Sequence, residues 1–99
     1  MSVRGRLPPE TIQRIVRQNF GRLRDCYQRA LQTQPSLEGR VVTSFVIGRD
    51  GRVSTVRNVG ATLPDHVVSC VTRAFYGIDF PQPEGGIVTV TYPVVFSPG

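Results

Sequence analysis

The spacing of the apolar residues alternates between a helical and a strand period along the chain, and this alternation constrains the fold more than any other feature. From Ile12 to Leu31, apolar residues recur at intervals of three and four, with arginines between them. This period is typical of an amphipathic helix with one buried face. Pro8 and Pro9 suit its first turn, and the helix must end before Pro35. We therefore expect one helix of about 23 residues here.

After this helix the sequence becomes rich in β-branched residues. The run Arg40–Ile47 predicts a first strand. The segment Gly48–Gly51 follows it and contains an Asp-Gly pair, which favours a tight hairpin turn. The second strand is expected from Val53 to about Val59. Because Val53 and Val56 are three residues apart, the alternation slips, which predicts a β-bulge.

A second helix and a third strand complete the pattern. Pro64 and Asp65 mark the start of a helix that ends at Gly77. The last strand alternates regularly, as a strand with one buried face does. One face is expected to carry Val88, Val90, Tyr92, Val94 and Phe96, and the other Ile87, Thr89 and Thr91.

The element order is helix, strand, strand, helix, strand, which indicates an α+β fold. We expect a three-stranded antiparallel sheet with two helices on one face. A right-handed crossover through the second helix places the third strand beside the first, so the strand order is 2-1-3. Pro93 supports an edge position for the third strand, because proline cannot donate to a ladder on both sides. Residues 8–99 then form one domain, and residues 1–7 are expected to be the tail of a linker.

The net charge is +5, from 12 basic residues, all of them arginine, against 7 acidic residues. A positive net charge can favour binding to nucleic acid, an anionic membrane or an acidic protein. The arginines are spread from Arg4 to Arg73, however, which is typical of a solvated surface. No stretch approaches the roughly 20 apolar residues of a membrane span. The start lacks the apolar segment of a secretory signal, so an exported domain is expected to belong to a longer chain.

The two cysteines lie one on each predicted helix. Cys26 is at the border of the first apolar face, and Cys70 is one turn beyond Val67. Because both helices should cover the same sheet face, the two thiols can meet in a disulfide. Two separate buried thiols are the alternative. A disulfide would indicate an oxidising compartment.

Several segments together resemble the TonB/TolA carboxy-terminal domain superfamily. They are RDCYQRAL, GRVVTSFVIGRDGRVSTVRNVG, LPDHVVSCVTRAFYGIDFPQP and the closing GGIVTVTYPVVF. The similarity spans about residues 9–97 and is nearest to the AgmX/PglI-type carboxy-terminal domain of myxobacterial TonB-family proteins, some of them linked to gliding motility. The pair of helix cysteines and the FPQP loop are its most specific features.

This resemblance implies a non-enzymatic periplasmic domain of a protein anchored in the inner membrane. It also implies energy or force transduction to an outer-membrane or periplasmic partner, whose strand pairs with an exposed sheet edge. That mode is β-augmentation. The matching edge in this chain is the third strand, with Ile87, Val88, Thr89, Val90, Thr91 and Tyr92 as the expected partner-binding residues. Pro93 removes a donor and limits pairing to these positions.

Other functions fit the sequence less well. Catalysis needs converging titratable groups, but the single histidine, His66, stands beside Asp65 at a helix start. An arginine-rich nucleic-acid-binding sheet could use Phe45 and Tyr92 for stacking, although both fall on the face expected to meet the helices. Self-association of sheet edges into a homodimer stays open. We expect no enzyme activity, cofactor, metal ion or nucleic-acid partner.

Overall fold

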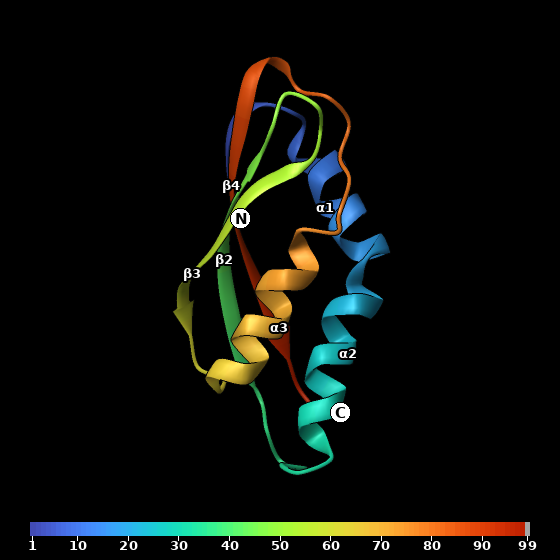
Figure 1. Cartoon of the computed structure of the whole chain (residues 1–99), viewed down its shortest axis with the longest axis vertical. Helices are drawn as coiled ribbons and strands as arrows, with labels where there is room; N and C mark the ends of the chain where they lie inside the picture. The colour runs from blue at the N-terminus through green and yellow to red at the C-terminus, as the bar shows by residue number, and fades with distance from the viewer. Residues whose placement is uncertain (99) are drawn as a thin grey trace.

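Four antiparallel strands form one sheet, and three helices cover one of its faces (Figure 1). This computed structural model describes residues 1–98. In chain order the elements are β1 (Ser2–Arg6), α1 (Pro9–Gln18), α2 (Phe20–Leu31), β2 (Gly39–Ile47), β3 (Val53–Ala61), α3 (Asp65–Phe75) and β4 (Glu84–Phe96). The α+β class is therefore confirmed.

The strand order is β1-β4-β2-β3. The expected order of the three main strands is confirmed, because β2 lies between β3 and β4. The expected number of strands is wrong, since residues 2–6 add a fourth strand along the outer side of β4. These residues were expected in a linker, and their sequence, Ser-Val-Arg-Gly-Arg, has no strand period that would have indicated otherwise.

The expected number of helices is also wrong, because the first helix is interrupted at Asn19. This residue has φ −101° and ψ 7°, outside the helical region. Its side-chain amide donates to the carbonyl of Ile15 at 2.8 Å. Asparagine favours such local bonds over helix continuation. The result is two helices, α1 and α2, where the spacing predicted one.

The hairpin between β2 and β3 follows the sequence closely. Gly51 has φ +86° and its amide donates to the carbonyl of Gly48 at 2.9 Å. The predicted slip in β3 is confirmed, and there are two: the register shifts between Val42 and Thr43 and between Val46 and Ile47 of β2. These bulges twist β3 while β2 keeps a continuous register with β4.

The core lies between the sheet and the helices. Phe45 of β2 is completely buried and packs against Phe75 of α3 and Phe80, with ring centroids 5.1 and 5.8 Å apart. Ile12 of α1 and Leu23 of α2 are completely buried as well. The other sheet face has no helix over it (Figure 1). The expected edge position of the strand that contains Pro93 is wrong over part of its length, because β1 pairs with the outer side of β4.

Candidate functional site

The six residues expected at the docking edge alternate in exposure along β4. Val88 and Val90 are completely buried against the helices, and Tyr92 is partly buried on the same face. Ile87 is 59% exposed on the opposite face, where Thr89 and Thr91 also lie, half-buried. The predicted alternation of the strand is therefore confirmed, but side chains alone do not decide which backbone groups are free.

The direction of the backbone groups follows from a bond on the far side of the sheet. The amide of Val56 in β3 donates to the hydroxyl of Tyr76 at 3.0 Å, so it points away from β2. Its register partner, Phe45, must then direct its own backbone groups toward β4. Phe45 faces Val90, and every second residue of β4 from Val90 bonds to β2.

The intervening residues of β4 direct their backbone groups to the outer edge. They are Thr89, Thr91, Pro93 and Val95. The first two are already paired, because Arg4 lies opposite Thr89 and Ser2 opposite Thr91. The expected docking edge is thus occupied, over the positions predicted to bind a partner, by the chain's own β1.

The attachment of β1 is weak. Its two hydrogen-bonded pairs exchange two bonds each, which together contribute about 2–6 kcal/mol. Ordering five backbone residues costs about 5–10 kcal/mol. Val3 is only half-buried, although Leu7, directly after β1, is buried. The backbone bonds alone therefore do not outweigh the cost of ordering β1, and burial of Leu7 and part of Val3 has to contribute the rest.

A glycine lets β1 lie close to β4. Gly5 has φ +129°, and a Cβ at this position would come within 2.8 Å of Val88 Cγ2 and 2.9 Å of the carbonyl oxygen of Ile87. The register also shifts between Arg4 and Arg6, so pairing is irregular at this end. Any side chain at position 5 would therefore push β1 away from the edge.

Beyond Thr91, no strand of the described residues covers the outer edge of β4. Pro93 offers only its carbonyl there, whereas Val95 offers both an amide and a carbonyl. Val95 is 68% exposed. The proline thus separates the part of the edge that β1 covers from a short part that is free.

A groove of 310 Å³ borders this free end. Phe20, Arg24 and Tyr27 line it from one face of α2, and Val95 and Phe96 line it from β4. The Phe96 ring stacks on Tyr27 with centroids 4.9 Å apart and on Phe20 at 5.8 Å. The guanidinium of Arg24 lies 5.8 Å above the Phe20 ring. Sequence reasoning missed this groove, although the three- and four-residue spacing on α2 places its lining on one helical face.

Tyr27 connects the groove to the segment before β2. Its hydroxyl donates to the carbonyl of Leu37. Burial raises the pKa of this hydroxyl above its usual value of about 10, and the nearby carboxylate of Glu38 adds to the rise. The hydroxyl therefore remains a donor at all physiological pH values, which holds this wall of the groove in place.

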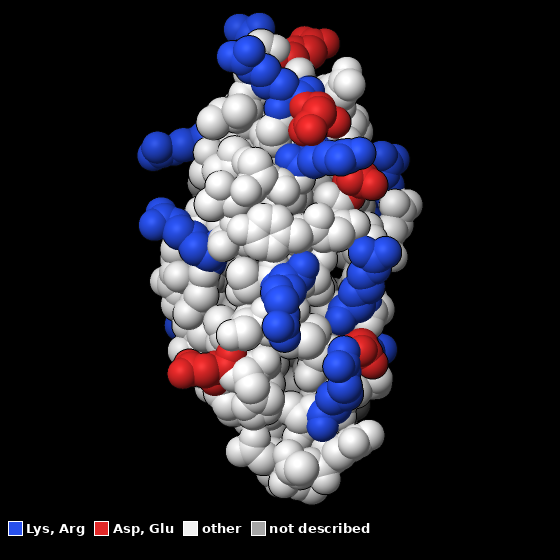
Figure 2. Space-filling model, viewed as in Figure 1, with Lys and Arg blue, Asp and Glu red and all other residues white. Residues whose placement is uncertain are grey.

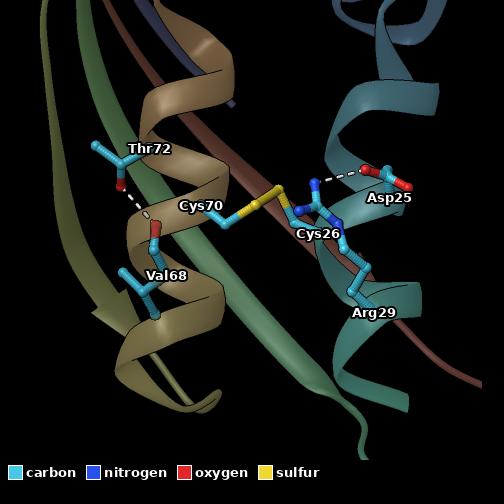
Figure 3. The surroundings of a disulfide bond; sticks show 6 residues. All are labelled: Asp25, Cys26, Arg29, Val68, Cys70 and Thr72. Atoms are coloured by element: carbon cyan, nitrogen blue, oxygen red, sulfur yellow. Dashed lines mark hydrogen bonds and ion pairs between the residues drawn. A yellow bond between two sulfur atoms is a disulfide. The ribbon is translucent and has the colours of Figure 1, made fainter. Parts of the chain in front are cut away.

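The expected disulfide between Cys26 and Cys70 is confirmed. It joins α2 to α3 with a Cα–Cα distance of 5.7 Å, and Figure 3 shows it bridging the two helices. Cys26 is buried and Cys70 is half-buried. The bond ties the α2 wall of the groove to the helix that packs on β2 and β3.

Residues considered for other chemistry are not brought together. His66 is exposed at the start of α3, and within residues 1–98 no three histidine, cysteine or carboxylate side chains cluster as metal ligands would. Phe45 is completely buried, so it cannot stack on a nucleic-acid base. Among the described helices, none has the length and apolarity that a membrane span requires.

This sheet order with a one-sided helical layer is the fold of TonB carboxy-terminal domains. The TonB domain of Pseudomonas aeruginosa matches with a TM-score of 0.58 and 23% identity over 70% of this chain and 73% of that one. The TonB domain of Helicobacter pylori matches with a TM-score of 0.57 and 29% identity over 68% and 73%. No protein-family model and no curated protein matches the sequence. The AgmX/PglI-type branch stays a prediction.

Proposed function

We propose that this chain is a non-enzymatic protein-interaction domain of a TonB-like envelope protein. In this proposal the domain works in the periplasm and its parent is anchored in the inner membrane. The domain transmits energy or force to an outer-membrane or periplasmic partner. The TonB fold and the disulfide, which persists in an oxidising compartment, support the location. A role in gliding motility rests on the sequence resemblance alone.

The observation that carries the proposal is the outer edge of β4. This edge already binds one strand, β1, and its next free backbone groups are those of Val95. A partner strand therefore meets a geometry that accepts β-augmentation. Pro93 sets where a partner can dock without competing with β1, because no donor is available at that position.

Partner docking proceeds in two steps in this scheme. The partner strand first pairs at Val95 and places a side chain in the groove beside Phe20 and Phe96. It then extends toward Thr91 and Thr89 as β1 leaves. The exchange of one strand for another conserves the backbone hydrogen bonds, so the groove contacts decide which strand stays.

In-cell crosslinking tests this scheme on the full-length parent protein. A photo-crosslinking residue replaces Val95, Thr91 or, as the matched control, Val59. Val59 is another exposed strand valine, 48% accessible, but it lies on β3 at the opposite edge of the sheet. We expect Val95 to capture an outer-membrane or periplasmic protein and Val59 not to capture it.

Deleting residues 2–6 sharpens the test. If β1 competes with the partner, the deletion increases capture at Thr91 and leaves capture at Val95 nearly unchanged. Capture from Val59 alone, or no effect of the deletion at Thr91, would contradict docking at this edge. Capture of a second copy of the same chain would favour the alternative, a self-associating scaffold, and light scattering over a concentration series would confirm that state.

A further inference from the structure

The helices carry a second concave surface, on the side of α2 that faces α3. Two hollows of 330 and 390 Å³ meet at the disulfide, and they share Arg29 of α2 and Arg73 of α3 as lining. Arg22 lines one end and His66 the other. We call this surface the α2–α3 groove. It lies apart from the groove beside Phe20, which the opposite face of α2 lines.

The α2–α3 groove is positively charged. Arg22, Arg29 and Arg73 line it, and the one acidic residue in its lining is Asp25. Asp25 is already paired with Arg29, with a nitrogen–oxygen distance of 2.6 Å. Within residues 1–98, neither Arg22 nor Arg73 forms an ion pair. Figure 2 shows basic side chains over the helical side of the molecule, and others at the sheet side and at the top of the view.

The arginines are held at different places along the groove. Arg22 donates to the carbonyl of Gly77 at 3.0 Å, and Cys26 is bonded to Cys70, so α2 and α3 run antiparallel. Figure 3 shows the Arg29 side chain extending toward Asp25 beside the disulfide. The disulfide lies between the two helices, so it holds Arg73 of α3 at a fixed distance from the helix that carries Arg22 and Arg29.

The dimensions fit a short extended polypeptide. The lining runs along α2 from Arg22 to Ala30, about 12 Å at 1.5 Å per residue, and Thr33 extends it just beyond the end of the helix. An extended chain rises about 3.3 Å per residue, so about five residues fill the groove. Arg22 and Arg29 are about 10 Å apart along the helix axis, so their long side chains can reach carboxylates two or four positions apart, which lie on the same face of an extended chain.

We propose that the α2–α3 groove binds an acidic peptide segment. The charge of the lining favours an anionic ligand, and the two hollows are shallow and open, so a peptide can lie across them from solvent. Nucleic acid is disfavoured because the lining contains no aromatic side chain on which a base could stack. An anionic membrane is disfavoured because the same lining offers no large apolar side chain for insertion. The site does not depend on β4, so the domain can hold an acidic segment and a partner strand at the same time.

Fluorescence anisotropy with a labelled hexaglutamate peptide tests this site on the oxidised chain at low ionic strength. The groove variant is Arg29→Gln with Arg73→Gln. The control variant, Arg14→Gln with Arg57→Gln, loses the same charge from exposed positions on α1 and β3. Screened surface charges predict a loss of affinity of about tenfold for the groove variant and below about twofold for the control. A labelled hexaglutamine peptide should not bind.

Amide chemical shifts locate the binding directly. Hexaglutamate should perturb amides of α2 and α3 near Ala30, His66 and Cys70 and leave β4 unperturbed. Equal losses for the two variants would overturn the proposal, since they would indicate attraction by net charge only. It would also be overturned if a single-stranded oligonucleotide, or vesicles containing phosphatidylglycerol, bound more tightly than hexaglutamate and lost affinity through the same groove variant.

Discussion

Removal of the disulfide is the perturbation whose effect can be worked out most directly. Cys26 and Cys70 are 44 residues apart in sequence. Closing a loop of this length lowers the entropy of the unfolded chain enough to stabilise the fold by about 4 kcal/mol. A small domain has a total stability of about 5–15 kcal/mol, so the crosslink supplies a large share of it.

The expected shift of the melting temperature follows from the chain length. Unfolding entropy is about 2.1 cal/mol/K per residue, or about 0.2 kcal/mol/K for a chain of this size. A loss of about 4 kcal/mol therefore lowers the Tm by about 20 °C. The double variant Cys26→Ser with Cys70→Ser, followed by circular dichroism during heating, measures this shift. Urea unfolding should give a higher m-value as well, because the unfolded chain becomes less compact.

Reduction of the natural chain is the matched control. The reduced chain and the double serine variant should melt within a few degrees of each other, and reductant should leave the variant unchanged. A Tm shift below about 5 °C would refute the reasoning. It would mean that the bond does not constrain the unfolded chain, or that α2 and α3 hold together equally well without it.

Three further predictions test the fold and the edge. Phe45→Ala should cost about 3–5 kcal/mol in urea unfolding, because this completely buried ring leaves a cavity. Thr89→Pro should abolish hydrogen-exchange protection in β1 and preserve it in β2, because the amide of Thr89 points toward β1. Val90→Pro should disrupt the whole sheet, because the amide of Val90 points toward β2. Because burial raises the pKa of Tyr27, stability should be constant below pH about 10 and fall as the pH rises further. Tyr27→Phe should remove this alkaline loss, and an unchanged pH profile would contradict the assignment.

The spacing of apolar residues predicted those helices and strands that bury one face against the core and expose the other. The apolar spacing from Ile12 to Leu31 located the helical region, and the alternation from Val88 to Phe96 located β4 and its buried face. The disulfide was predictable for a related reason. Two amphipathic helices that must cover one sheet face bring Cys26 and Cys70 together.

The break in the first helix and the groove beside Phe20 were not predicted from the sequence, because they depend on individual contacts and not on the apolar spacing. Asn19 leaves the helical region while its side-chain amide bonds the carbonyl of Ile15, and nothing in the apolar spacing predicts this local bond. The groove beside Phe20 required the exact crossing of α2 over the end of β4.

The N-terminal strand β1 separates most clearly what the sequence predicts from what only the tertiary structure decides. The sequence alone predicted the class of the fold, the order of the three main strands, the buried face of β4 and a disulfide as one of two states of the cysteines. Only the tertiary structure decided that residues 2–6 form a strand and cover the outer edge of β4. Polar residues without a period have no strand preference of their own, and they become a strand here because β4 presents unpaired backbone groups to them.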